Sequence, residues 1–550
     1  MLRDTPVLIV GGGPIGLAAA LDLSWRGVRN VLVEQDPRTA PVLLAKAGTL
    51  NARTLEFCRR WGIADQVTHW GAPEDFPRDT VYCTSLGGLP IGRDIAPSQR
   101  DRRPPDSSPE MLQKCPQHVF DPLLAQAVAA RGHSELLYST RITSFEQDDE
   151  GVNATLLDLV RGETSTIRAQ YMVACDGAAS MLRRSLEIPF EGPTLDYSVS
   201  ALLKIDGLER YHAFGMAERF LFIGREGTWA NMTSVDFKRL WRFTLVGSEE
   251  RLDPARLDLK SYLKRAFGGL AIPCEILRVV PWRRSQCTAA SYVKGRVLLA
   301  GDAAHTTSPT GGHGLNTGLG DVVGLGWILE ALVKGWGGPQ LLQAYEAERR
   351  PVAIRNGQSS TRNYKSWVRS DSDYLQVEAP GPEADAARAS IGNQLNAMLY
   401  PEWNSLGIAL GYRYENSPVI APDGSPEPLD DASVCVQTSR PGHRAPHVWL
   451  GDEAGGRSTI DLFGVGFVLL RLSELAPCAN TLTEAAAAQG VPLRVVELRQ
   501  PEVVKAYEKK LVLVRPDGHV AWRGDVLPDD LVALLRIVSG RAKVTEVALA

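Results

Sequence analysis

The chain has 550 residues, of which 44% are hydrophobic and 23% are charged, and its formal net charge is −4. A chain of this length is too long for one hydrophobic core, so we expect two or three domains. A balanced charge with no dominant basic stripe argues against a nucleic-acid-binding protein. No apolar run approaches the roughly 18 residues of a membrane-spanning helix, which argues against a membrane protein.

The eight cysteines are scattered along the chain and form no CxxC pair, so they predict neither a metal site nor a dithiol redox centre. Scattered single cysteines are typical of a reducing compartment. The first residues lack the basic region and the small-residue cleavage site of a signal peptide. We therefore expect a cytoplasmic protein.

Residues 6–34 predict a strand, a tight turn, a helix and a second strand, a βαβ unit with a right-handed crossover. The turn carries Gly11-x-Gly13-x-x-Gly16. Gly11 permits the tight turn, Gly13 lets a pyrophosphate approach the helix N-terminus, and Gly16 allows close packing of helix on strand. Glu34, 18 residues after Gly16, is placed to accept hydrogen bonds from an adenosine ribose. The segment predicts a dinucleotide site without distinguishing NAD from FAD.

The amino-acid composition of the middle of the chain changes twice. Residues 75–110 are rich in Pro, Gly, Ser, Asp and Arg, and the stretch 98–109 within them, with three prolines and charges of both signs, predicts an exposed or mobile loop. Residues 185–290 contain the apolar runs of a second sheet, with a helix near 258–267. Because 296–335 again has the pattern of strand, loop and long helix, the second sheet is predicted to interrupt the first domain. Between these parts we expect a helix over 117–131 and strands over 135–145, 152–160 and 165–175.

The C-terminal part has the pattern of a separate module. A helix-rich stretch runs to about residue 398, and a Pro/Gly/Asp-rich linker follows over 417–430. The last part predicts a small α/β module with the order β-α-β-β-α, in which Pro516-Asp517-Gly518 forms a hairpin turn. Its predicted strands lie within 461–472 and over 493–498, 511–514 and 519–522, and its helices over 482–489 and 529–538.

Two further segments bear on the choice of cofactor. Asp176-Gly177 follows an apolar strand, and by itself this pair also fits an ordinary β-turn. Gly301-Asp302 directly follows another buried strand, where an acidic side chain is well placed to bind a polyol such as the ribityl chain of a flavin. Residues 309–314 are glycine-rich and open a predicted helix over 315–331. Its free N–H groups suit the partial negative charge of a reduced flavin, although they also fit the start of a packing helix.

Together the three segments resemble the GxGxxG, DG and GD motifs of the class A flavoprotein aromatic hydroxylases, which are single-component FAD-dependent monooxygenases. The resemblance extends over the full chain. Residues 440–447 (RPGHRAPH) and 514–523 (VRPDGHVAWR) are similar to the thioredoxin-like third domain of the phenol hydroxylase branch. That branch includes 2,4-dichlorophenol hydroxylases, 3-(3-hydroxyphenyl)propionate hydroxylases and polyketide ring hydroxylases.

The resemblance implies an α/β fold with a Rossmann-type, glutathione-reductase-like FAD-binding domain in two pieces, 1–184 and 291–398. A β-sheet substrate domain, 185–290, interrupts it. A linker, 399–430, leads to a thioredoxin-like domain, 431–550. Because this last domain lacks a CxxC, the implied role is structural or dimer-forming, so a homodimer is a possible assembly.

The resemblance also implies which residues bind the cofactor. The FAD site would be formed by Gly11, Gly13, Pro14, Ile15, Gly16, Glu34, Gln35, Lys46, Arg53, Gln117, Asp176, Gly177, Gly301, Asp302, Pro309, Gly312, Gly314, Leu315 and Asn316. The sequence departs from the family pattern at two places. Lys46 stands where an arginine is common, with Arg53 as an alternative, and Ser308-Pro309 replaces a double proline. His313 follows Gly312 and would tune the flavin, touch the substrate or simply line the start of the helix.

For this family the implied reaction uses NADPH or NADH to reduce FAD, and O₂ then forms a C4a-hydroperoxyflavin that hydroxylates a small phenolic or aromatic substrate. The candidate substrate-side residues are Tyr197, Arg225, Arg242 and His313, with His212 and Trp229 nearby; each also fits a surface or sheet-packing role. Residues 240–245 resemble the hydroxyphenylpropionate group and residues 82–88 the chlorophenol group, so the substrate stays open.

Three alternatives remain. One is a polyketide or other natural-product ring hydroxylase of the same family. Another is a related flavin oxidoreductase that does not hydroxylate, although the WxWxI segment of flavin halogenases is missing from the sequence. The third is a non-enzymatic carrier that has kept a nucleotide-binding fold.

Overall fold

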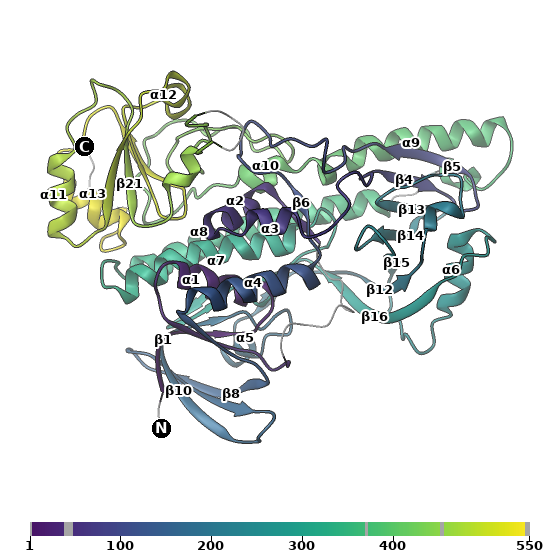
Figure 1. The fold of residues 1–550 in the computed structure, drawn as a ribbon, viewed down its shortest axis with the longest axis horizontal. Helices are drawn as coiled ribbons and strands as arrows, with labels where there is room; N and C mark the ends of the chain where they lie inside the picture. The colour runs from purple at the N-terminus through teal and green to yellow at the C-terminus, as the bar shows by residue number, and fades with distance from the viewer. Residues whose placement is uncertain (1–2, 38–47, 369–371, 452–455, 545–550) are drawn as a thin grey trace.

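The computed structural model describes residues 3–37, 48–368, 372–451 and 456–544. The chain forms a mixed α/β fold with several separate sheets, which confirms the predicted fold class at this level. Figure 1 shows the N-terminal sheet at the bottom, the second sheet at the right-hand end and the C-terminal module at the upper left. Helices α7 (His313–Val333) and α8 (Gln340–Trp367) run through the middle of the molecule.

The first sheet has eight strands, and its central strands are parallel. Residues 7–10 of β1 are almost completely buried, as expected for a parallel strand covered on both faces. The predicted strand over 135–145 is two strands, β7 and β8, because the chain turns at Ser139 with φ 50°. The strands of this sheet are β1 (Arg3–Val10), β2 (Asn30–Val33), β7 (Ser134–Leu137), β8 (Thr140–Gln147), β9 (Val152–Asp158), β10 (Thr164–Ala174), β18 (Val293–Lys294) and β19 (Val297–Leu299).

Helices pack against this sheet and against one another. Helix α1 (Pro14–Trp25) contacts both α4 (Gln117–Arg131) and α7. Pro14 occupies the first turn of α1, where a missing N–H removes no intrahelical hydrogen bond. Shorter elements complete this part: α2 (Ala52–Trp61), α3 (Ala64–Thr68), α5 (Met181–Ser185), the pair β3 (Thr49–Leu50) and β6 (Gln113–Lys114), and the small sheet of β11 (Phe190–Glu191), β17 (Cys287–Ala289) and β20 (His305–Thr306).

The second sheet has seven strands in the order β16-β12-β15-β14-β13-β4-β5. Apolar side chains of one face pack against helix α6 (Leu259–Phe267), and part of the other face is covered by α9 (Pro382–Trp403). This sheet lies at the end of the molecule beneath α9 in Figure 1. Its strands are β4 (Thr80–Cys83), β5 (Pro90–Asp94), β12 (Thr194–Lys204), β13 (Arg219–Gly224), β14 (Gly227–Ser234), β15 (Leu240–Ser248) and β16 (Glu275–Ser285).

The predicted loop over 98–109 contains neither a helix nor a strand, and residues 99–106 are exposed or half-buried. The segment over 75–97 was not predicted to form strands, but it contributes β4 and β5 to the second sheet, and all four residues of β4 are buried. Ser107 and Ser108 are also buried, at 6% and 0% exposure. Glycines and prolines break the segment into pieces too short to show a period, so its sequence pattern hides two short strands whose partner lies more than 100 residues away.

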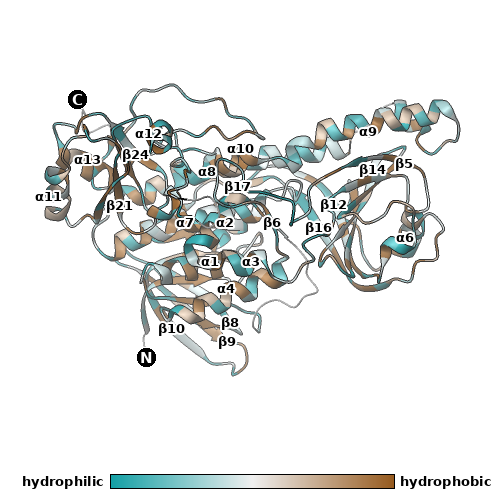
Figure 2. Ribbon diagram, turned by 45° about the horizontal axis from the view of Figure 1, so that its top comes forward, coloured by the Kyte–Doolittle hydropathy of each residue, from teal (hydrophilic) through white to brown (hydrophobic). Residues whose placement is uncertain are grey.

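The C-terminal module contains the four-stranded sheet β22-β21-β23-β24. Helix α12 (Pro501–Tyr507) was not predicted, because only seven residues separate a proline start from a left-handed end at Glu508. Figure 2 draws β21 in brown because its side chains are apolar. The remaining elements are β21 (Phe467–Arg471), β22 (Leu493–Glu497), β23 (Leu511–Val514), β24 (Val520–Gly524), α11 (Asn480–Ala488) and α13 (Leu531–Val538).

The connection between α9 and the module is only partly a linker. Helix α9 continues to Trp403 and α10 (Leu406–Leu410) follows, so the first part of the predicted linker is helical. The module shares a core with α7, since Trp327 packs against Phe467 at 6.2 Å between ring centroids.

Among the described residues, no helix is both long and apolar enough to cross a membrane. The described part of the chain also has the short 3₁₀ turns η2 (Leu208–Arg210), η3 (Gly301–Ala303), η4 (Ser372–Gln376) and η5 (Thr459–Leu462).

Four buried histidines predict that acid destabilises the fold. Their exposure is at most 5%, and burial lowers the pKa of His313, His443 and His447 to about 4 and that of His519 to about 3. Between about pH 6.5 and 4 the unfolded chain therefore binds protons that the folded chain does not. Stability then falls as pH falls, by about 1.4 kcal/mol per pH unit for each such histidine.

The measurement is the midpoint of thermal unfolding at pH 7.5, 6.5 and 5.5. His519→Asn is expected to reduce the pH dependence, whereas His133→Asn, at an exposed position, leaves it unchanged. A midpoint that stays constant or rises on acidification would contradict the prediction.

Candidate functional site

The carboxyl ends of four parallel strands meet at one edge of the first sheet. The paired register places Val33 beside Val10, Val10 beside Ala174, and Ala174 beside Leu299. Each of the predicted motifs begins within two residues of one of these strand ends. The GxGxxG turn, Glu34, Asp176-Gly177 and Gly301-Asp302 are therefore brought to the same edge, the usual position of a ligand site in an open α/β sheet.

The three glycines of the first motif have different roles in the structure. Gly11 has φ +109°, and a Cβ there would lie 2.3 Å from the carbonyl oxygen of Cys175. A Cβ on Gly16 would lie 1.8 Å from the carbonyl oxygen of Gly11. Gly13 is extended, at φ −71°, and a Cβ there would meet no atom within 4 Å. Gly11 and Gly16 thus serve packing, whereas Gly13 leaves open space at the N-terminus of α1, which no side chain caps.

The acidic side chains at this edge use only part of their hydrogen-bonding capacity within the protein. Glu34 accepts hydrogen bonds from the backbone N–H groups of Gly12 and Asp36, and Gln35 beside it is exposed. Asp176 accepts one hydrogen bond through Oδ2 from Leu182 N, at 3.1 Å, while its buried Oδ1 has no partner among the described residues. These oxygens suit the hydroxyl groups of a dinucleotide.

Other predicted cofactor residues surround the same edge. Gly177 has φ +78° with open space around it, and Asp302 is exposed in η3 at the end of β19. Ile15 of α1 lies against Gly301, where a Cβ would meet it at 2.8 Å. Gln117, at the start of α4, donates a hydrogen bond to Asp121 at 3.1 Å.

The N-terminus of α7 is held in place by Asn316. Its Oδ1 accepts hydrogen bonds from Asn51 N and Thr54 Oγ1, at 2.9 and 2.8 Å. Its Nδ2 donates to the carbonyl oxygens of Thr49 and Gly312, at 3.0 and 2.7 Å. The Asn316 side chain thus fixes the helix start rather than reaching outward. Gly312 is left-handed, at φ +66°, and no side chain caps the helix; Pro309 is exposed and Leu315 half-buried.

His313 is an uncharged side chain at neutral pH. It is 3% exposed, and burial, followed by the nearby charge of Arg355, lowers its pKa to about 4. Its Nε2 has no partner among the described residues. A Cβ on Gly311 would lie 2.7 Å from this Nε2, so the ring packs directly behind the glycine turn.

The sequence missed a polar network that joins the second sheet to the α7 turn. Asp196 of β12 accepts hydrogen bonds from Arg284 of β16 and from the Tyr364 hydroxyl of α8, at 3.1 and 2.5 Å. Arg284 also donates to Ser308 Oγ at 2.8 Å. Nothing in the local sequence marks these residues, because they lie on separate elements and meet only in the fold.

Comparisons with known proteins identify the family of the chain. Residues 4–360 match the family model described as FAD binding domain. Residues 438–542 match the one described as aromatic-ring hydroxylase, C-terminal. The chain belongs to the FAD-dependent aromatic-ring hydroxylases. Members of this family are monooxygenases, so the chain is an oxidoreductase that binds FAD.

This hydroxylase is similar over nearly its whole length to several characterised proteins. It is 31% identical to the phenol 2-monooxygenase of Pseudomonas sp. (strain EST1001), covering 98% of this chain and 93% of that protein. Its identity to the tetracenomycin B2 monooxygenase-dioxygenase of Streptomyces olivaceus is 32%, with 98% of both chains covered. The structure of RebC with bound 7-carboxy-K252c superposes with a TM-score of 0.90 at 37% identity, covering 98% of this chain and 100% of that chain. For aklavinone-11 hydroxylase with FAD and aklavinone the TM-score is 0.81 at 28% identity, covering 98% and 99%.

Two of the predicted cofactor residues need separate comment. Lys46 lies outside the described residues. Arg53 donates hydrogen bonds to Glu56, at 2.7 Å, to the Asp517 carbonyl, at 2.8 Å, and to the Tyr412 hydroxyl, at 3.3 Å, and its role in holding FAD stays a prediction. Arg53 faces the C-terminal module and serves that contact.

The predicted substrate-side residues do not gather at one place. Arg225 lies in the exposed turn between β13 and β14, about 20 Å from the start of β13 at roughly 3.3 Å per residue. Trp229 packs against Phe222 in the apolar core, at 5.7 Å. His212 packs against Phe220, at 5.1 Å. Arg225 therefore belongs to an exposed turn, whereas Trp229 and His212 contribute to the packing of the sheet.

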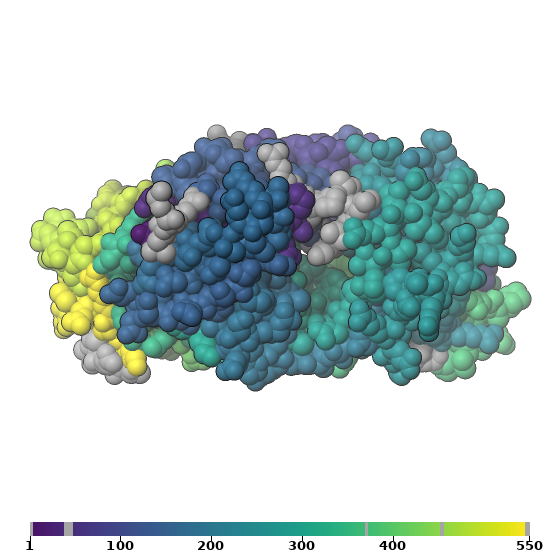
Figure 3. Space-filling model, turned by 90° about the horizontal axis from the view of Figure 1, so that it is seen from below, coloured from purple at the N-terminus to yellow at the C-terminus, as the bar shows by residue number. Residues whose placement is uncertain are grey.

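Tyr197 and Arg242 lie elsewhere on the second sheet. Tyr197 is half-buried beside a bulge in β12, next to the Asp196 network. Arg242 of β15 is paired in register with Leu202 and Thr233. Figure 3 shows the surface hollowed between the N-terminal part, drawn in blue, and the second sheet, drawn in teal.

Gly13→Val is expected to remove FAD binding without unfolding the hydroxylase. The extended backbone accepts a side chain and the space is open, but the new side chain would fill the room for a pyrophosphate. We expect the FAD content of the purified protein to fall at least tenfold. The measurement is the ratio of flavin to protein absorbance, with far-UV circular dichroism as the test of folding.

Gly451→Val is the matched control, because Gly451 also has open space and no positive φ but lies far along the chain in the C-terminal part. Its FAD content should equal that of the wild type. Normal flavin content in Gly13→Val would show that the pyrophosphate lies elsewhere.

Proposed function

We propose that this monooxygenase uses NADPH or NADH together with O₂ to hydroxylate a small phenolic or aromatic ring. The observation that carries the proposal is the meeting of the three motifs at one sheet edge, beside the open N-termini of α1 and α7. Bound FAD would supply the redox chemistry, taking electrons from the nicotinamide and activating O₂. The protein would bind and orient the two substrates and exclude water from the reacting ring.

Each part of the cofactor has proposed ligands. Gly11, Gly13, Pro14, Gly16, Glu34 and Gln35 would bind the ADP half, and Asp302, with Gly301 and Gln117, the ribityl region. The turn from Pro309 through Gly312 and Gly314 to Leu315 would lie against the isoalloxazine, with Ile15 packing below. Asp176 and Gly177 would serve both FAD and the nicotinamide cofactor. The partnerless buried Oδ1 of Asp176 and the open space at Gly13 support this fit.

We also propose domain roles. Residues 1–184 and 291–398 would form a Rossmann-type FAD-binding domain, and 185–290, joined by β4 and β5, the substrate domain. The module over 431–550 would be thioredoxin-like, with a structural or dimer-forming role. The parallel order β19-β10-β1-β2 and the four-stranded sheet β22-β21-β23-β24 support these roles.

The test is direct. The purified protein should show a flavin spectrum, and a phenol panel should contain compounds that stimulate NAD(P)H oxidation with matching O₂ uptake. With ¹⁸O₂, one labelled oxygen atom should appear in the product. Substrate-stimulated NAD(P)H oxidation that yields only H₂O₂ would overturn hydroxylation for that panel and favour a non-hydroxylating flavin oxidoreductase.

A polyketide or other natural-product ring is the second candidate. Its support is that tetracenomycin monooxygenases are among the relatives and that aklavinone-11 hydroxylase shares the fold over the whole chain. A panel that includes polycyclic phenols separates the two, because a natural-product hydroxylase should turn over the larger rings with the lower KM.

A further inference from the structure

One turn of the C-terminal module faces the long helices of the first domain. This turn is the hairpin over residues 515–519, between β23 and β24, and it contains the almost completely buried side chains of Arg515 and His519. Arg515 donates hydrogen bonds to both carboxylate oxygens of Glu348 on α8, at 2.6 and 2.8 Å. Its guanidinium also lies 5.0 Å from the ring centroid of Trp327 on α7. The hairpin therefore rests directly on both helices.

Backbone hydrogen bonds connect this hairpin to the segment that follows α10. The Val520 carbonyl accepts a hydrogen bond from Gly442 N, at 2.8 Å, and the Gly442 carbonyl accepts one from Tyr414 N, at 3.0 Å. Val520 N in turn donates to the His443 carbonyl at 2.9 Å. The position of Tyr414 is thus set by the same backbone contacts that hold the hairpin.

The His519 ring packs against two tyrosines of that segment. Its centroid lies 4.2 Å from that of Tyr414 and 5.4 Å from that of Tyr412. Its Nδ1 lies 3.3 Å from Asp517 Oδ2, but neither ring nitrogen forms a hydrogen bond with a described residue. The His519 side chain therefore acts mainly through the packing of its ring.

Arg349 of α8 connects Tyr414 to α7. The Tyr414 hydroxyl accepts a hydrogen bond from Arg349 Nη1 at 3.3 Å. The same guanidinium donates through Nε to Asp321, at 2.9 Å, and through Nη2 to the Thr317 carbonyl, at 3.0 Å. A Cβ on Gly320 would lie 2.6 Å from Arg349 Nη2, so α7 has a glycine where the guanidinium approaches it. The hairpin, Tyr414 and Arg349 thus form one continuous set of contacts that ends on α7.

These contacts continue to the two turns that are proposed to bind FAD. Asp321 accepts a hydrogen bond at 3.1 Å from Gly301 N, which begins the turn that carries Asp302. Tyr412 and His313 line one cavity of about 10 Å³, a volume that holds about one water molecule. Little space therefore separates the residues that contact the module from the start of α7.

We infer that the C-terminal module takes part in holding FAD, because its hairpin, through Tyr414 and Arg349, keeps the Gly301 turn and the start of α7 in their cofactor-binding positions. His519 and Tyr414 are then positioning residues that act on FAD binding without touching FAD. This inference rests on the proposed placement of FAD at these two turns. It requires a reciprocal effect, since contacts that strengthen FAD binding are themselves strengthened when FAD binds.

The first experiment compares hydrogen–deuterium exchange in the full-length wild-type protein with and without FAD. We expect exchange over residues 511–524, which include the hairpin, to slow about threefold or more when FAD binds. Helix α12 is the internal reference, because it lies at the upper edge of the module in Figure 1, away from α8, and its exchange should slow less. A hairpin whose exchange does not change, or changes no more than that of α12, overturns the inference.

Tyr414→Phe tests the hydroxyl that accepts the hydrogen bond from Arg349. We expect the dissociation constant of FAD, measured by flavin fluorescence, to rise about fivefold, since the ring remains and one buried hydrogen bond is lost. Tyr507→Phe is the matched control, because it removes a buried hydroxyl that donates to the Pro446 carbonyl, at 2.8 Å, within the module. Its FAD binding should equal that of the wild type. Equal weakening in the two variants would assign the effect to module stability and overturn the inference.

His519→Ala removes the ring that packs on the two tyrosines. We expect FAD binding to weaken about tenfold, and His519→Phe, which restores a ring at this position, to recover most of the affinity. A loss that reflects general destabilisation would lower the urea midpoint without this recovery. His519→Ala and Tyr414→Phe proteins that fold and bind FAD as tightly as the wild type overturn the inference. None of these measurements uses a substrate, so their outcome is independent of the hydroxylation assay.

Discussion

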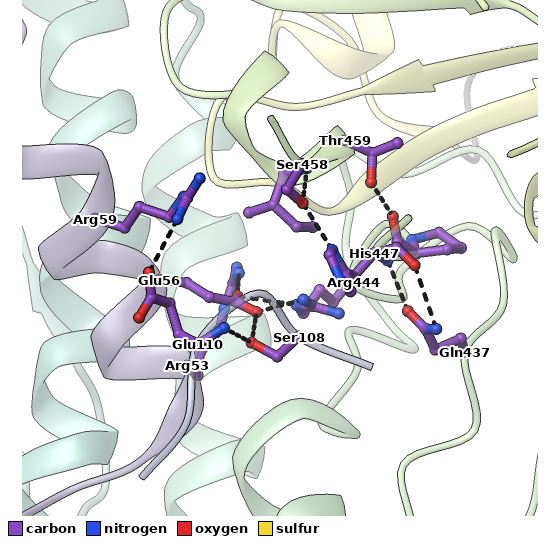
Figure 4. Close-up of polar contacts among 12 residues, drawn as sticks. Arg53, Glu56, Arg59, Ser108, Glu110, Gln437, Arg444, His447, Ser458 and Thr459 are labelled. Atoms are coloured by element: carbon purple, nitrogen blue, oxygen red, sulfur yellow. Dashed lines mark hydrogen bonds and ion pairs between the residues drawn. The ribbon is translucent and has the colours of Figure 1, made fainter. Parts of the chain in front are cut away.

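Replacing Glu56 with Gln is expected to lower the free energy of unfolding by about 3–5 kcal/mol, the usual cost of breaking a buried ion pair from one side. Glu56 lies on α2 with 3% exposure and joins this helix to the C-terminal module (Figure 4). It accepts hydrogen bonds from Arg53, at 2.7 Å, from Ser108, at 2.6 Å, and from Arg444 through both of its oxygens. The variant leaves Arg53 and Arg444 buried without a counter-charge.

The Glu56 carboxyl group stays ionised down to low pH. Burial alone raises its pKa, but the charges of Arg444 and Arg53 outweigh burial and bring the pKa to about 2. The stability that this carboxylate contributes is therefore present above pH 4.5 and lost as pH falls toward 2. Urea unfolding at pH 7.5 measures the effect.

Glu474→Gln is the control for this variant. It removes an ion pair with Arg499 of similar length, 2.7 Å, but the Glu474 side chain is 76% exposed. We expect a change within about 0.5 kcal/mol. Equal losses in the two variants would contradict the role assigned to burial at Glu56.

Sequence patterns were sufficient to predict features that depend on residues close together in the chain. At Gly11 a Cβ would lie 2.3 Å from a carbonyl oxygen, so only glycine fits there. This requirement appears in the sequence as the fixed spacing of the glycines. Buried parallel strands such as β1 are visible as short apolar runs. From these signals the sequence predicted the motifs that meet at one edge of the first sheet.

Sequence patterns did not predict contacts between residues that lie far apart in the chain. The sequence does not show that Arg53 donates to a carbonyl 464 residues away as well as to a carboxylate on its own helix. Arg219 begins a strand of otherwise apolar residues, and only the register with β14 and β15 shows that it shares a face with Arg242. Strand register is not encoded locally, so the sequence could not show which side chains of the second sheet share a face.

Asp321→Asn is expected to cost about 3–5 kcal/mol of stability and also to weaken FAD binding. Asp321 of α7 is completely buried. Its Oδ1 accepts a hydrogen bond from Arg349 Nε at 2.9 Å, and its Oδ2 from His305 Nε2 at 2.8 Å and from Gly301 N at 3.1 Å. An amide in this place cannot neutralise Arg349, which is 1% exposed, and presents an N–H₂ group toward donors.

The cofactor effect follows from Gly301. Because Asp321 holds the backbone N–H that begins the Gly301-Asp302 turn, loss of this acceptor frees the segment that carries Asp302 at the flavin edge. We expect the dissociation constant of FAD to rise at least tenfold, measured by flavin fluorescence on the reconstituted protein, together with the lower urea midpoint. Asp253→Asn, in an exposed ion pair with Arg256 at 3.7 Å, should change neither. A variant that loses stability but binds FAD normally would show that Asp321 supports the helix packing alone and does not position the turn.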